Sequence, residues 1–290
     1  MQFNVDPNLN NQFNNRKRII LDTCSNLRAL GREHLKGYWL MGAVVMFLFT
    51  LMLRLPVAII DALFGRTVTV NLGRDLNLGE AYKDVTYTVT SSPMSNVYAL
   101  LVVGALSFGM TLFIMNVYRR KQAGVSDLFR GFEFYVRATG LFLYQLLFIM
   151  LWFMIPLVGI VTGVMASIRY SMAYFVMLDH PEYTIPMCVN ESKRLMFGNK
   201  MKYFTLQLSF IGWIILASVP AFILGGIGAW MTYQPGSTGG AMVVYELVSI
   251  LIMAGIYPVM AYTESASMAF YEILIGNEEA EVYYPETQTI

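Results

Sequence analysis

Arg169 is the residue of this sequence whose type and position most clearly require a chemical partner. It lies near the middle of an apolar stretch, residues 159–178, that contains no other charged residue. An arginine at the centre of a membrane-spanning helix costs about 2.5–3.5 kcal/mol on insertion scales, and such residues usually face the bundle interior or a wet cavity. We therefore expect Arg169 to face either another part of the protein or a ligand.

Polar residues in the cytosolic halves of other apolar segments are the candidate partners of Arg169. One hypothesis is a pocket, open to the inner leaflet or the cytosol, that binds an anionic group such as a lipid phosphate. The other is a structural arginine that amides and helix carbonyls satisfy. The candidate ligand-binding set is Arg169, Gln145, Tyr144, Gln207 and Asn116, with Glu264 as a further neighbour.

Small residues recur at every fourth position of the same stretch. Gly159, Gly163, Ser167 and Ser171 form a stripe on one face of a helix, which allows a second helix to pack closely. Arg169 points about 200° away from this stripe, because an α-helix has about 3.6 residues per turn. The spacing predicts one face for helix packing and another that carries the arginine.

The composition predicts a membrane protein. Hydrophobic residues make up 56% of the chain and charged residues only 13%, with a mean hydropathy of +0.53; soluble domains contain about 45–50% and about 25%, respectively. The net charge of +1 supplies no broad basic surface, so we expect no nucleic-acid partner. Two cysteines, and no HExxH or GxSxG motif, predict a protein that is not an enzyme and holds no metal or cofactor.

Six apolar segments are each long enough to cross a membrane, because a helical span needs about 20 residues. The third and fourth follow one another directly and are expected to form a hairpin. The fifth is expected to be broken at Pro220, which removes a helix hydrogen bond, and Pro258 is expected to kink the sixth. The predicted spans cover residues 37–60, 96–118, 138–156, 159–178, 203–230 and 242–262.

The segments outside these spans differ in character. Residues 61–93 form a sizeable loop on the far side, where two alternating stretches predict a small β-hairpin-like cap. Residues 1–15 are expected to be a disordered leader and residues 276–290 an acidic cytosolic tail. A single six-span membrane domain is predicted between them, over residues 16–275.

Three basic amphipathic segments, residues 16–35, 119–137 and 179–202, each precede a pair of spans. Such segments can lie on an anionic leaflet or pack against the protein itself. Each contains a glycine followed by basic and aromatic residues, which predicts a threefold repeat of a surface helix plus a hairpin. The glycines that we align for this repeat are Gly31, Gly131 and Gly198.

The basic residues predict the orientation of the chain. Fifteen of the 20 Lys and Arg residues lie on the side of the amphipathic segments, and four lie on or near the other side. The positive-inside rule therefore puts both termini in the cytosol. The expected fold is an all-α membrane protein of six transmembrane helices, arranged as three hairpins that each follow a cytosolic amphipathic helix, with a small extracytoplasmic β-hairpin-like loop.

Four motifs carry a resemblance to a known family. They are VSDLFRGFE (residues 125–133), IPLVGIVTGVMASIRYSMAYFVMLDHPE (155–182), NESKRLMFGNKMKYFTLQLSFIGW (190–213) and AFYEIL (269–274). From about Leu27 to Leu274 the chain resembles the DUF975 family of bacterial integral membrane proteins of unknown function. The resemblance implies a bacterial cytoplasmic membrane and supplies no catalytic residues. Family members usually carry a shorter loop after the first span, so residues 61–93 are expected to be particular to this chain.

The function that the sequence favours is non-enzymatic. We expect a multi-pass protein that binds a lipid or a hydrophobic peptide, or that acts as a membrane partner of another complex. The alternative is a small-solute or lipid transporter that uses the broken fifth helix and Arg169, with enzymatic lipid modification as a third hypothesis. The expected partners are membrane lipids, another membrane protein or a second copy of the chain.

Overall fold

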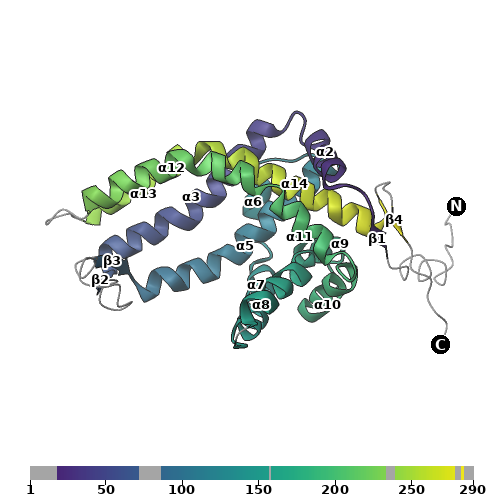
Figure 1. Cartoon of the computed structure of the whole chain (residues 1–290), viewed down its shortest axis with the longest axis horizontal. Helices are drawn as coiled ribbons and strands as arrows, with labels where there is room; N and C mark the ends of the chain where they lie inside the picture. The colour runs from purple at the N-terminus through teal and green to yellow at the C-terminus, as the bar shows by residue number, and fades with distance from the viewer. Residues whose placement is uncertain (1–17, 72–85, 157, 233–238, 278–281, 284–290) are drawn as a thin grey trace.

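The structure is a computed structural model that describes residues 18–71, 86–156, 158–232, 239–277 and 282–283. The leader predicted at residues 1–15 and most of the predicted tail lie outside the described residues. The described part is mostly helical (Figure 1), and six of its helical segments are long and apolar enough to cross a membrane. The prediction of a helical multi-pass protein with six candidate spans is confirmed. These spans are Trp39–Phe64, Pro93–Tyr118, Tyr135–Phe153, Gly159–Asp179, Lys200–Ile223 and Val243–Ile275.

The helices and strands follow one another along the chain with short connections. The first half contains β1 (Ile19–Ile20), α2 (Cys24–His34), α3 (Trp39–Phe64), β2 (Arg66–Asn71), β3 (Thr86–Ser91), α5 (Pro93–Tyr118), α6 (Ser126–Arg130) and α7 (Tyr135–Phe153). The second half contains α8 (Gly159–Tyr170), α9 (Ala173–Asp179), α10 (Ile185–Leu195), α11 (Lys200–Leu208), α12 (Ile211–Thr232), α13 (Gly239–Ile252), the 3₁₀ turn η2 (Met253–Gly255), α14 (Ile256–Ile275) and β4 (Val282–Tyr283). Strand β1 pairs antiparallel with β4, and β2 pairs antiparallel with β3.

The last three candidate spans are each interrupted. The fourth breaks between α8 and α9, the fifth between α11 and α12, and the sixth at η2. The predicted break at Pro220 is wrong, because α12 continues through this proline and the chain breaks at Ser209–Phe210 instead. Proline is tolerated within membrane helices, where neighbouring groups satisfy the freed carbonyl. Pro258 lies in the first turn of α14, directly after η2, so the expected kink falls just before it.

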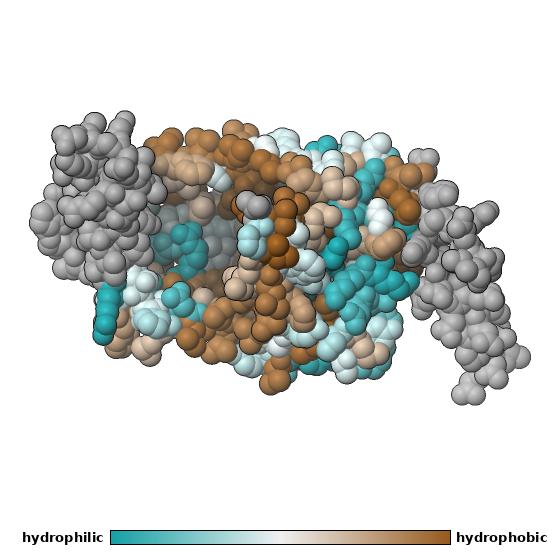
Figure 2. All heavy atoms as spheres, turned by 60° about the horizontal axis from the view of Figure 1, so that its bottom comes forward, coloured by the Kyte–Doolittle hydropathy of each residue, from teal (hydrophilic) through white to brown (hydrophobic). Residues whose placement is uncertain are grey.

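Three pairs of consecutive long helices pack against each other. They are α3 with α5, α7 with α8, and α12 with α13. In Figure 1 the first and third pairs extend to one side of α14, whereas α7 and α8 point in another direction. On the face shown in Figure 2, hydrophobic side chains cover the middle, and hydrophilic ones gather mainly towards the end that carries β1 in Figure 1.

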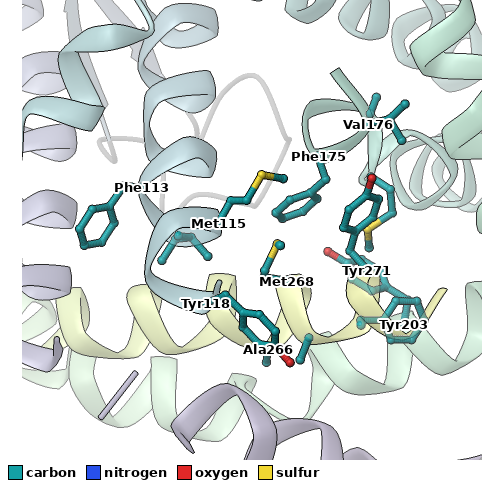
Figure 3. Packing of buried hydrophobic residues seen from close by; sticks show 14 of the residues in the cluster. Phe113, Met115, Tyr118, Phe175, Val176, Tyr203, Ala266, Met268 and Tyr271 are labelled. Carbon is teal, nitrogen blue, oxygen red and sulfur yellow. The ribbon is translucent and has the colours of Figure 1, made fainter. Parts of the chain in front are cut away.

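Helix α14 lies at the centre of the packing and contacts α2, α3, α5 and α12. Residues 265–274 of this helix are buried, and Figure 3 shows large side chains of α5, α9 and α11 gathered around it. At one end of the helix, Arg119 bridges α5 to α9 and α14. Its guanidinium donates to both carboxylate oxygens of Asp179, at 2.6 and 2.9 Å, and to the buried carboxylate of Glu272 at 2.6 Å. This charge cluster is fully paired, so we assign it a structural role.

Four-residue turns at residues 35–38, 131–134 and 196–199 each join a short helix to the start of a candidate span. Gly37 and Gly198 occupy the third position of the first and third turns, with φ of 88° and 87°. Glycine adopts this left-handed conformation without steric cost. The glycine alignment predicted from the sequence is therefore out of register, because Gly31 lies within α2 and Gly131 opens the second turn. The shared helix–turn–helix geometry nonetheless supports the proposed repeat.

Candidate functional site

Arg169 lies in the last turn of α8, immediately before the break at Ser171–Met172. Ser192 of α10 bridges this break, because its hydroxyl donates to the Arg169 carbonyl at 2.8 Å and accepts from the Met172 N–H at 3.2 Å. Gln145 of α7 donates its amide to the Tyr170 carbonyl at 3.2 Å. The backbone on both sides of Arg169 is thus held by side chains from two neighbouring helices.

The Arg169 side chain lacks an anionic or carbonyl partner among the described residues. Its Nε is buried without a hydrogen bond, and no ion pair to its guanidinium is found in this part of the chain. The residue as a whole is half-buried, with its guanidinium carbon 6.0 Å from the centre of the Trp152 ring. Lys200, the first residue of α11, lies within electrostatic range of Arg169 and adds a second positive charge.

Two features offset part of the free-energy cost of the Arg169 charge. The C-terminal end of a helix favours a cation by about 0.3–1 kcal/mol, and a cation over a Trp ring gains about 0.5–2 kcal/mol. Neither feature accepts a hydrogen bond from the five guanidinium N–H donors. A buried donor without a partner costs about 1–3 kcal/mol. Within the described residues, the geometry therefore does not provide the amides and carbonyls that the structural hypothesis for Arg169 requires.

The other residues of the predicted ligand-binding set are committed to other partners. Gln207 donates to the Ser267 hydroxyl at 3.0 Å, and Asn116 donates to the Asp127 carboxylate at 3.0 Å. Tyr144 packs on Phe148 with 4.7 Å between ring centres, and Glu264 forms no ion pair with Arg169 within the described part of the chain. Of the predicted set, the structure brings only Gln145 into hydrogen-bond contact with a residue adjacent to Arg169.

The predicted stripe of small residues packs over only part of its length. Gly159 and Gly163 face α7, where a Cβ on Gly163 would lie 2.6 Å from the Phe153 ring. Ser167 is exposed, and its hydroxyl donates to the Val164 carbonyl at 2.8 Å, so it makes no helix contact of the predicted kind with the described residues. Ser171 is half-buried at the α8–α9 break, and its hydroxyl bonds to the Ile168 carbonyl.

The helix pair that carries Arg169 has an exposed apolar surface. The outer faces of α7 and α8 expose a set of large hydrophobic side chains that no described helix covers. These residues are Leu147, Met150, Leu151, Ile160, Val161 and Val164.

Sequence reasoning missed three residues of this site. Trp152 and Ser192 carry no distinguishing signal in the sequence, and Lys200 counted only towards the orientation of the chain. Outside this site, Arg54 Nε lies 2.6 Å from Glu246 Oε1 across α3 and α13. This ion pair lines a separate groove of about 570 Å³, and both of its members are satisfied.

A known protein family matches the part of the chain that contains Arg169. The family model described as "Protein of unknown function (DUF975)" matches residues 149–278. Over these residues the chain is similar to the DUF975 family. The DUF975 match includes Trp152, Arg169, Ser192 and Lys200, but not α2, α3 or α5. No curated protein and no solved structure matches the chain.

Proposed function

We propose that this protein is a non-enzymatic multi-pass membrane protein that binds an anionic lipid through Arg169. The observation that carries this proposal is the buried Nε of Arg169, which has no partner among the described residues. A guanidinium fork matches two oxygens of a phosphate, and such charge-assisted bonds are the stronger kind. Lys200 supplies a second positive charge, and the exposed face of α7 and α8 suits acyl chains.

We further infer that the protein lies in the cytoplasmic membrane of a bacterium with both termini in the cytosol. The distribution of basic residues supports this orientation. In it, α2, α6 and α10 are cytosolic amphipathic helices that each lead into one of three hairpins, and the β2–β3 pair is extracytoplasmic. Arg169 then lies near the middle of its span, and its long side chain can extend towards the inner-leaflet headgroups.

The test is retention of lipid by the purified full-length protein. Native mass spectrometry after delipidation and addition of phosphatidylglycerol should show fewer bound lipids on R169Q than on the wild type. R130Q is the matched control, because the Arg130 side chain is 49% exposed and its ion-pair distances to Asp127 and Glu133 are 3.8 and 3.9 Å. Equal retention by wild type and R169Q would overturn the proposal.

The source of the anionic group needs a separate arm of the same experiment. If inorganic phosphate displaces phosphatidylglycerol at millimolar concentration, the ligand is a free anion rather than a lipid. Co-purification of a hydrophobic peptide, a partner subunit or a second copy of the chain would assign the apolar face to protein instead. K200Q is expected to weaken lipid retention less than R169Q, because Lys200 adds charge without the bidentate fork.

A transporter is the second candidate function, and the interrupted helices favour it. The fourth, fifth and sixth candidate spans all break, and Arg169 lies at one of these breaks. Broken helices form the substrate sites of known secondary transporters. Phosphate or lipid flux in proteoliposomes that is lost in R169Q would establish transport, whereas lipid retention without flux would leave binding as the function.

A further inference from the structure

A second basic groove lies between α2 and the helices α3, α12 and α14, and it is separate from the Arg169 site. Its cavity volume is about 430 Å³. Its wall combines two arginines, three aromatic rings and a small apolar patch, and none of its lining residues is acidic. The lining residues are Ser25, Arg28, Arg32, Trp39, Trp213, Pro258, Val259 and Tyr262.

The position of α2 on α14 fixes the arginines of this groove. Ser265 donates its hydroxyl to the Gly31 carbonyl at 2.9 Å, and Tyr262 donates to the Arg28 carbonyl at 3.1 Å. A Cβ on Gly31 would lie 2.9 Å from the Ala266 nitrogen, so α2 can approach this closely only with glycine at this position. Arg28 and Arg32 are four residues apart and therefore neighbours on one helix face.

The two positive charges of the groove have no counter-ion among the described residues. Arg28 Nη1 lies 3.5 Å from the Ser209 carbonyl, at the limit of hydrogen bonding. Arg32 is exposed, and no hydrogen bond or ion pair of its side chain is found in the described part of the chain. Two neighbouring guanidiniums above a cavity without a carboxylate are complementary to a phosphate group.

The aromatic residues of the groove favour a phosphate that belongs to a membrane lipid. Trp39 and Trp213 lie close to the starts of α3 and α12 and are 37% and 56% exposed. Tryptophan rings are enriched at the headgroup level of membranes, where one edge meets water and the other meets acyl chains. Pro258 and Val259 continue this wall with apolar surface.

We propose that this groove binds the headgroup of an anionic phospholipid, with Arg28 and Arg32 on the phosphate and the two tryptophans beside the glycerol and upper acyl chains. The site goes beyond the proposed function at Arg169, and its arginines lie outside the part of the chain that matches DUF975. Each arginine beside an anionic leaflet changes affinity by roughly fivefold. The double variant R28Q/R32Q should therefore bind about 25-fold more weakly.

Tryptophan fluorescence of the full chain in phosphatidylcholine nanodiscs tests this proposal. The chain contains 4 tryptophans, so a W152F/W230F background leaves only the two of the groove. Brominated phosphatidylglycerol should quench them at a low mole fraction, whereas brominated phosphatidylcholine should quench them only in proportion to its content. The R28Q/R32Q variant should shift the phosphatidylglycerol midpoint about 25-fold, and R28K/R32K should retain most of the affinity.

Three outcomes would overturn the proposal. They are equal quenching by the two brominated lipids, an unchanged midpoint in R28Q/R32Q, and displacement of the lipid by millimolar glycerol phosphate. If the double variant fails to fold, R32Q alone should shift the midpoint about fivefold, because Arg32 makes no contact that folding requires. R169Q and R130Q should leave the midpoint unchanged, so failure of this site is distinguishable from failure of the Arg169 site.

Discussion

Replacement of Arg169 by methionine is expected to stabilise the protein in the absence of anionic lipid. A central arginine costs about 2.5–3.5 kcal/mol on insertion scales. Trp152 and the end of α8 offset about 1–2 kcal/mol of this cost, and the buried Nε remains without a partner. Methionine fills a similar volume without a charge, so the free energy of unfolding should rise by about 1–2 kcal/mol.

Anionic lipid should reverse the order of stability of the two proteins. At a concentration 100 times its dissociation constant, a ligand that binds only the folded state raises the free energy of unfolding by about 2.7 kcal/mol. Phosphatidylglycerol should therefore stabilise the wild type more than R169M, which keeps only the groove of Arg28 and Arg32 to bind it. Unfolding by sodium dodecyl sulfate titration in detergent, with and without added phosphatidylglycerol, measures both quantities.

The same titration can refute the reasoning about Arg169. A loss of 2 kcal/mol or more in R169M without lipid would show that the arginine is a satisfied structural residue, because removal of one partner of a buried charge pair costs about 3–5 kcal/mol. Equal stabilisation of both proteins by phosphatidylglycerol would place the lipid elsewhere. R130M serves as the control, since its exposed side chain should change neither quantity.

Three further predictions test the fold around these sites. R119Q should lower the free energy of unfolding by about 3–5 kcal/mol in the same titration, because it leaves the buried Glu272 carboxylate unpaired; a loss below 1 kcal/mol would contradict the structural role of the cluster. G109A should cost about 1–3 kcal/mol, because its Cβ would overlap the backbone of residues 127–128, and an unchanged stability would contradict this packing. In inverted membrane vesicles, maleimide should label Cys24 before Cys188, because burial raises the pKa of the Cys188 thiol and leaves less thiolate at neutral pH; equal labelling rates at pH 7, or no labelling from the cytosolic side, would contradict the burial or the orientation.

The sequence predicts the candidate spans well because each of them is a long apolar run. It fails on where the helices break, since the breaks depend on contacts between segments that are distant in the chain. The break in the fifth span was predicted at Pro220 from the local effect of proline. The chain instead bends at Phe210, whose buried ring packs 4.9 Å from the ring of Tyr262. The break after Arg169 depends in the same way on Ser192, which lies on a different helix.

The candidate site, like the fold, could be predicted from the sequence only in part. Arg169 can be found from the sequence, because a single charge in an apolar run is conspicuous. The surroundings of Arg169 cannot be found in this way, because each amide side chain that we predicted as its partner bonds to a nearer acceptor in the folded chain. Asn116, for instance, bonds to Asp127 on the adjoining short helix, and Gln207 bonds to Ser267 of α14. The spacing of polar residues along the helices does not reveal these pairings.

The second helix–turn–helix unit, which precedes the hairpin that contains Arg169, differs from the other two. The first and third units have short helices of 11 residues and a left-handed glycine in the turn, whereas the second has a helix of 5 residues and Glu133 at that position. In the second unit, Gly131 and Gly109 bring α6 and α5 into backbone contact, much as Gly31 brings α2 against α14 in the first unit. The hairpin of α7 and α8 that follows points in a different direction from the other two (Figure 1). This hairpin also carries Arg169, whose buried Nε has no hydrogen bond among the described residues.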